Sequence, residues 1–124
     1  MKLYNILCIA TSVLFIFLFF QLILIPDDFV RSMGLQPAVA TAVLARRAAM
    51  FMLGISTLLF CSKNLENLKA RQSICLSTGI TLIGLAFTGI YEHFMGTVNN
   101  SIFIAITIET ILGFSFLSIF FRKR

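Results

Sequence analysis

Two arginines and one glutamate stand inside stretches of this sequence that are otherwise apolar. Arg46 and Arg47 are adjacent in one stretch, and Glu109 lies in another. A charged side chain inside a membrane is costly unless it is paired or faces a cavity, so such residues are candidates for a functional site. These residues could form a structural ion pair, bind a small charged ligand, or carry protons or ions.

The composition is that of a membrane protein. The 124 residues are 59% hydrophobic and 12% charged, with a net charge of +5. A soluble domain is about a quarter charged. We therefore expect one membrane domain over residues 1–124. Because the basic residues flank apolar stretches, lipid is the expected partner and nucleic acid is not.

Four stretches are long enough to cross a bilayer. They cover residues 3–25, 38–60, 73–95 and 101–121, each near the ~20 residues that a spanning helix needs. A chain in lipid must satisfy its own backbone hydrogen bonds, so helix is expected. The sequence predicts an all-α, integral membrane four-helix bundle. Between the first two spans, residues from Asp27 to Gly34 form either a short helix or an irregular loop, and residues 62–72 form a polar loop.

The basic residues indicate an orientation. Outside the spans, seven basic residues fall on one side of the membrane and one, Arg31, falls on the other. The seven are Lys2, Lys63, Lys69, Arg71, Arg122, Lys123 and Arg124. Cytoplasmic loops carry the excess of Lys and Arg, so both termini are expected in the cytoplasm.

The charged residues should lie at one depth. Arg46 is seven residues beyond Val39, and Glu109 is seven beyond Ile102, so both lie about 10 Å below the outer boundary. We expect Glu109 to pair with Arg46 or Arg47. Adjacent residues point about 100° apart, so the second arginine would face Glu92, a lipid phosphate or a ligand anion.

Other polar residues belong to the same leaflet. The expected site, either a buried ion pair or a ligand-binding patch, contains Gln21, Arg46, Arg47, Glu92 and Glu109. Small residues allow close helix contact in membranes. Such contact faces are expected at Ala42, Ala45 and Ala49, at Ala105 and Gly113, and at Ser77, Thr81, Gly84 and Thr88.

Catalytic and metal-binding patterns are not recognisable in the sequence. His93 is the single histidine, and the odd cysteine count (Cys8, Cys61 and Cys75) favours apolar packing over disulfides on a reducing side. Nucleophile elbows, phosphate loops, zinc helices and dinucleotide fingerprints are not found. We expect no catalytic or metal-ligating residues. No cofactor is required by the sequence, and a bound quinone or lipid is left open.

Several short motifs, which together span most of the chain, carry a family resemblance. They are Pro26 with Phe29, Met33-Gly34-Leu35, Arg46-Arg47 followed by Leu53-Gly54, the Gly96 turn, and Ile108-Glu109. The sequence resembles the DoxX-like small membrane proteins, and more closely one branch of that four-helix group. The resemblance implies a four-helix bundle in a bacterial cytoplasmic (inner) membrane. Some relatives are subunits of quinone-linked oxidoreductases, but no defined catalytic motif can be carried over.

The sequence favours a non-enzymatic accessory or assembly subunit that works with a partner membrane protein or as a homo-oligomer. One alternative is a binder or carrier of a small anionic, lipid or quinone-like ligand. Another is an oligomeric proton-coupled transporter. The small four-helix multidrug transporters place their key glutamate in the first span, where this chain has Gln21, which argues against membership of that group.

Overall fold

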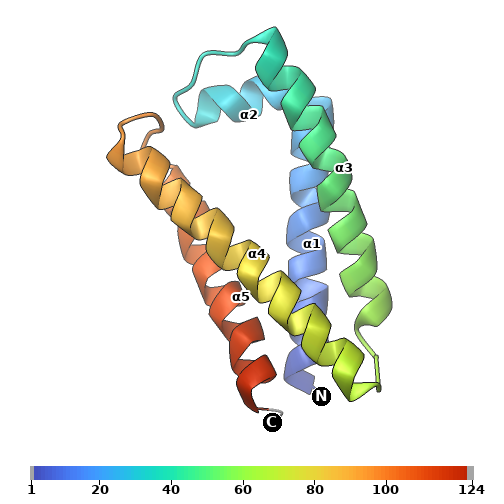
Figure 1. Ribbon diagram of the computed structural model, residues 1–124. Coiled ribbons are helices and arrows are strands. Elements are labelled where there is room, and N and C mark those ends of the chain that lie inside the picture. Colours follow the sequence, from blue (N-terminus) through green and yellow to red (C-terminus); the bar gives the residue numbers. More distant parts are fainter. Residues whose placement is uncertain (1, 123–124) are drawn as a thin grey trace.

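The computed structural model describes residues 2–122, and this part of the chain is built from helices (Figure 1). The helices are α1 (Lys2–Leu24), α2 (Pro26–Ser32), α3 (Val39–Ser62), α4 (Leu68–Phe94) and α5 (Ile102–Arg122). All but α2 are long and apolar enough to cross a membrane. The expected spans are therefore present, with ends that shift by up to five residues.

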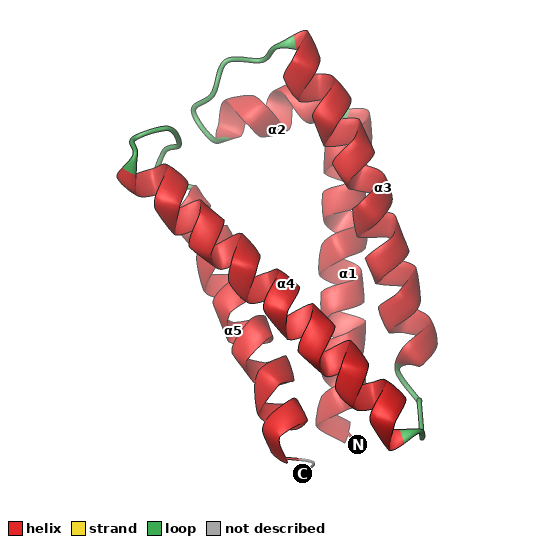
Figure 2. Ribbon diagram, viewed as in Figure 1, coloured by secondary structure: helices red, strands yellow, loops and turns green. Residues whose placement is uncertain are grey.

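The four long helices are arranged as two pairs. α1 packs along α3 and α4 packs along α5, whereas contact between the pairs is made mainly by α1 and α5. The pairs lie close together near the chain ends and diverge toward α2, which lies across the wide end (Figures 1 and 2). The sequence predicted a four-helix bundle, and the structure has the four long helices as two pairs that meet at one end.

The hydrophobic core occupies the narrow end, where the two pairs meet. Tyr4, Cys8, Leu82 and Phe116 are each at most 1% exposed there. Arg71 is 6% exposed, and its guanidinium carbon lies 5.6 Å from the centre of the Tyr4 ring. The sequence had placed Arg71 in a polar loop, but α4 begins three residues earlier and carries it into the core.

The contact between the two helices of a pair differs from one pair to the other. In the α1–α3 pair, the Ser12 hydroxyl donates to the Ser56 carbonyl oxygen at 2.9 Å, and the Ser56 hydroxyl donates to the Ser12 carbonyl oxygen at 2.9 Å. In the α4–α5 pair, glycines bring the backbones close together. A Cβ atom on Gly79 would lie 2.7 Å from Leu117 Cγ, and one on Gly113 would lie 2.8 Å from Ile83 Cδ1.

The small-residue face expected on the third span is not the face that packs. Ser77, Thr81, Gly84 and Thr88 are all exposed, and a Cβ atom on Gly84 would meet nothing within 4 Å. The buried face of α4 instead contains Cys75, Thr78, Gly79, Leu82, Ala86 and Gly89. Both rows have helical spacing, so spacing alone did not identify the face that meets α5.

Candidate functional site

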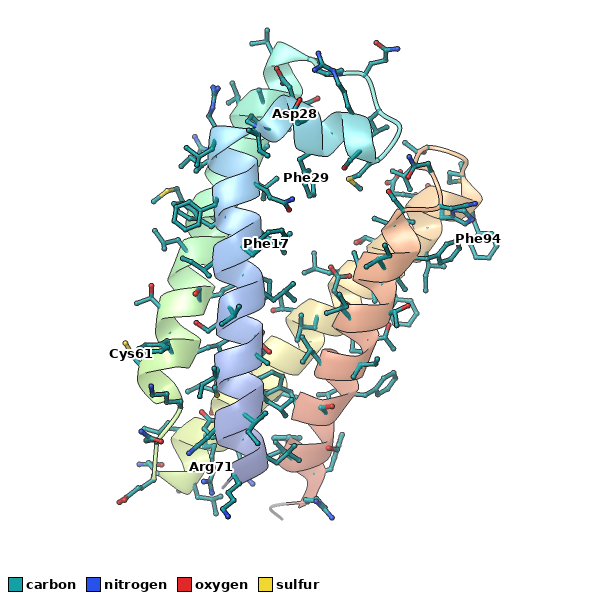
Figure 3. All side chains as sticks on the ribbon, turned by 180° about the vertical axis from the view of Figure 1, so that it is seen from behind. Phe17, Asp28, Phe29, Cys61, Arg71 and Phe94 are labelled. Carbon is teal, nitrogen blue, oxygen red and sulfur yellow. The ribbon has the colours of Figure 1, made fainter. Side chains whose placement is uncertain are left out.

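A cleft of about 570 Å³ lies between the two helix pairs, below α2. A cavity of this size is within the ordinary range for sites that bind small molecules. Figure 3 shows Phe17 of α1 and Phe29 of α2 pointing into the space between the pairs. The full lining consists of Leu14, Phe17, Leu18, Gln21, Leu22, Phe29, Ser32, Met33, Met52, Leu85, Thr88, Gly89, Glu92, Ser101, Ile102, Ile104, Ala105, Ile108 and Glu109.

Helical periodicity brings these residues to one cavity. Residues three, four and seven positions apart share a helix face. The lining follows this spacing on α1 from Leu14 through Leu18 to Gln21, and on α4 from Leu85 through Gly89 to Glu92. On α5 it follows Ile102, Ala105 and Glu109. Each of these three helices therefore presents a mostly apolar face, with Gln21 on α1, Thr88 and Glu92 on α4, and Glu109 on α5.

Three of the five expected site residues meet in the cleft. Gln21, Glu92 and Glu109 all line it, and all three are half-buried. Within residues 2–122 none of these side chains forms a hydrogen bond or an ion pair with another side chain or with the backbone. A carboxylate accepts hydrogen bonds and a neutral amide also donates them. The cleft thus offers unused acceptors on a mostly apolar wall.

Arg46 and Arg47 lie elsewhere, and the expected ion pair with Glu109 is not formed. Both arginines are exposed, and neither lines the cleft. Arg46 and Glu109 each lie seven residues beyond the start of a helix, because α3 begins at Val39 and α5 at Ile102. The rotation of α3 does not agree with the expected pair: its buried residues face α1, and the arginines project from other sides of the helix.

The wide end of the cleft is closed by α2 and a turn from the other pair. Of the two alternatives for residues from Asp27 to Gly34, a short helix or an irregular loop, the structure has the helix. Pro26 is its first residue, and Gly34 lies beyond its end with a φ of +81°. Asn99, in the turn between α4 and α5, donates its backbone N–H to the Met33 carbonyl oxygen at 2.9 Å. The α2 segment is thus tied to the α4–α5 pair.

The histidine and the cysteines lie outside the cleft. The His93 ring packs 4.4 Å from the Phe103 ring, measured between centroids, and its Nδ1 is buried without a hydrogen-bond partner among the described residues. Cys8 and Cys75 are buried, whereas Cys61 is exposed. The described residues contain no group of three or more His, Cys, Asp or Glu side chains that could hold a metal ion.

The cleft has features that the sequence analysis did not include. Most of its wall is apolar, and Phe17, Phe29, Met52 and Thr88 had not been considered as site residues. A usable signal was present in the positions of the polar residues: Gln21 and Glu92 lie three and two residues before the ends of α1 and α4, and Glu109 lies seven residues into α5. Tracing each helix face inward from these polar residues would have identified Leu14, Leu85 and other apolar neighbours.

Comparison with family models, curated proteins and solved structures gives no match. The resemblance to the DoxX-like proteins therefore stays a prediction from the motifs.

Proposed function

We propose that this chain is a multi-pass membrane protein that binds a small lipophilic molecule in the cleft between its helix pairs. The observation that carries the proposal is the cleft itself: about 570 Å³, mostly apolar, with unpaired Gln21, Glu92 and Glu109 on its wall. Sites for small molecules typically combine an apolar lining with a few polar groups that orient the ligand.

The polar groups define the part of the ligand that they would hold. Among the described residues that line the cleft, the ionisable ones are two carboxyl groups, Glu92 and Glu109. The arginines that would have held an anion lie outside. The cleft therefore favours a molecule with an apolar body and a cationic or hydrogen-bond-donating end, in place of the anionic ligand considered from the sequence. Hydrogen bonds to charged groups are stronger than neutral ones, so this end would determine the ligand's orientation.

The proposed setting is a bacterial cytoplasmic membrane, as the family resemblance implies, with both termini in the cytoplasm. The charge bias of the loops supports this orientation. Both described chain ends and the α3–α4 turn lie at the narrow end, opposite α2 (Figure 1). In this orientation the wide end of the cleft faces the outer leaflet.

A pair of lipophilic ions of the same shape tests the proposal. Equilibrium dialysis in detergent, with empty micelles as the blank, would measure the binding of tetraphenylphosphonium and of tetraphenylborate. We expect the cation to bind more tightly than the anion. Glu109→Gln should weaken cation binding about tenfold, because it removes a charge-assisted contact. Glu66→Gln is the matched control, since Glu66 is exposed in the α3–α4 loop.

Several outcomes would contradict the proposal. Equal binding of the two ions, tighter binding of the borate, or an equal loss in Glu66→Gln would each show that the cleft carboxyl groups do not select the ligand. Native mass spectrometry of protein released gently from its own membrane would then identify any small molecule that it does retain.

The accessory-subunit function is the second candidate, and one observation favours it. Gly54 on α3 and Gly84 on α4 both lie on exposed faces, and a Cβ atom on either would meet nothing within 4 Å. Such faces permit another transmembrane helix to approach closely. Native mass spectrometry should then detect a stable protein complex that Gly84→Ile disrupts; a monomer before and after the substitution would contradict it.

A further inference from the structure

We propose that Arg46 and Arg47 form a binding site for the phosphate group of an anionic phospholipid on the outward face of α3. The site is independent of the cleft and of the function proposed for it. Both arginines are exposed, and neither has a hydrogen-bond or ion-pair partner between residues 2 and 122. In an apolar span, two unpartnered charges require a neutralising group from outside the chain.

The rotation of α3 directs the arginines away from the protein. Ala49 is fully buried, and it lies on the face of α3 that packs against α1. At 100° per residue, Arg47 points about 160° away from Ala49, and Arg46 points about 60° away. Arg47 therefore faces the membrane, and Arg46 lies at the edge of the α1 contact.

The direction of the side chains brings their charges toward the headgroups. Arg46 and Arg47 are seven and eight residues beyond Val39, the first residue of α3, which corresponds to about 10–12 Å of helix. Helical side chains lean toward the N-terminus of their helix, and the N-terminus of α3 is at the wide, α2 end (Figure 1). Long arginine side chains can extend along this direction to the membrane interface.

The charge balance of this region favours a phosphate. α3 contains no acidic residue. On α2, Asp28 is engaged by Arg31, with the charged atoms 3.5 Å apart. A lipid phosphate is the anion that a bilayer supplies at the interface that these side chains reach, and the guanidinium group can donate two parallel hydrogen bonds to it. The alanines at 42, 45 and 48 have short side chains and leave room beside the arginines for a headgroup.

Lipid binding to the full chain in detergent tests the proposal. Native mass spectrometry would titrate phosphatidylglycerol and phosphatidylcholine with identical acyl chains. The wild type should retain phosphatidylglycerol preferentially. Each basic side chain near an anionic surface contributes about fivefold, so Arg46→Gln with Arg47→Gln should reduce phosphatidylglycerol affinity roughly thirtyfold. Arg31→Gln is the matched control, because Arg31 is also exposed near the wide end.

Two further measurements test whether the guanidinium geometry matters and whether the bound phosphate belongs to a lipid. Arg46→Lys with Arg47→Lys keeps the charge but loses the two-pronged geometry, so partial loss is expected. Soluble glycerol 1-phosphate should not displace the lipid, and displacement would show a site for free phosphate instead. Unchanged lipid affinity in the glutamine variant, an equal loss in Arg31→Gln, or a dimer that the glutamine variant disrupts would overturn the proposal. Circular dichroism would verify that each variant is folded.

Discussion

The side-chain amide of Asn99 donates a hydrogen bond to the main-chain carbonyl oxygen of Ser32 at 3.0 Å, across the wide end of the molecule. Ser101 donates its hydroxyl to the same carbonyl oxygen at 3.0 Å. A helix leaves its last carbonyl groups without partners inside the helix. The α4–α5 turn therefore satisfies the end of α2, and in doing so it joins two helix pairs that contact each other mainly at the narrow end.

Removing the Asn99 side chain should loosen the α2 segment. Asn99→Ala deletes the bond to Ser32, which contributes about 1 kcal/mol if it is typical of protein hydrogen bonds. Hydrogen–deuterium exchange should become faster over residues 26–34, while exchange in the core of α1 should stay unchanged. Asn100→Ala is the control, because the exposed Asn100 side chain has no hydrogen bond in the described chain. Equal acceleration in both variants would contradict a specific role for Asn99.

The glycines of α4 should respond to alanine substitution in opposite directions. A Cβ atom on Gly79 would lie 2.7 Å from Leu117 Cγ, whereas one on Gly84 would meet nothing within 4 Å. Gly79→Ala forces the Leu117 side chain of α5 to move, and overpacking of this kind costs about 1–3 kcal/mol. Gly84→Ala should be neutral or stabilising by up to about 1 kcal/mol, because alanine favours helix.

Unfolding of the two variants in mixed detergent, followed by circular dichroism, would measure this difference. The substitution is the same and the helix is the same, so intrinsic helix propensity cancels in the comparison. If Gly79→Ala were as stable as Gly84→Ala, the close α4–α5 contact would not exist in the folded protein.

The positions of the helices followed from the sequence because the bilayer fixes the length of a span. Stretches of about 20 apolar residues between polar turns predicted the four long helices. For residues from Asp27 to Gly34 the sequence allowed a short helix or an irregular loop, and the short helix α2 is present. The sequence also placed Gln21, Glu92 and Glu109 in one leaflet, and all three line the cleft. Depth along a helix can be counted residue by residue.

Rotation about a helix axis could not be counted in the same way. A span that is apolar on all sides has no polar face to indicate which side meets protein, so the depth of Arg46 and Glu109 said nothing about whether they face each other. In α3 the small residues Ala42, Ala45 and Ala49 did indicate the packing face, since Ala49 is fully buried, and Arg47 is off that face. In α4 two rows of small residues have helical spacing. The row with Gly84, which the sequence analysis expected to pack, is exposed, and the row with Gly79 is buried.

The Ser12–Ser56 contact should show strong coupling between the two serines. The two hydroxyl oxygens lie 3.0 Å apart in a hydrogen bond that either alanine substitution removes, and both side chains are buried. In membranes such a contact between helices contributes about 0.6 kcal/mol on average and at most about 1.7 kcal/mol. A double-mutant cycle with Ser12→Ala and Ser56→Ala should therefore give a coupling energy in this range.

Thr57 supplies a control for that cycle. Its hydroxyl donates to the Leu53 carbonyl oxygen within α3, so Thr57→Ala removes a hydroxyl from the same helix without touching the contact between helices. Thr57→Ala should show no coupling to Ser12→Ala. Additive effects of Ser12→Ala and Ser56→Ala would contradict the bond between the two hydroxyls and would leave each hydroxyl's bond to the carbonyl oxygen of the other residue as an independent contribution.

Filling the cleft should abolish ligand binding while the fold is retained. Ala105 lines the cleft on the same face of α5 as Glu109, so the ring of Ala105→Phe would occupy space that the ligand's apolar body needs. Thr107→Phe adds a similar ring two residues later, where the side chain is exposed and lies outside the cleft. Equilibrium dialysis of tetraphenylphosphonium should show lost binding in the first variant and wild-type binding in the second.

This comparison separates the shape of the cleft from its charge. Glu109→Gln leaves the volume almost unchanged and removes a carboxyl group, so some binding of the apolar body should persist. Ala105→Phe keeps both carboxyl groups and removes volume, so little binding should persist if the apolar wall provides most of the affinity. Loss in Thr107→Phe as well would place the binding surface on the outside of α5, and the cleft would then not be the ligand site.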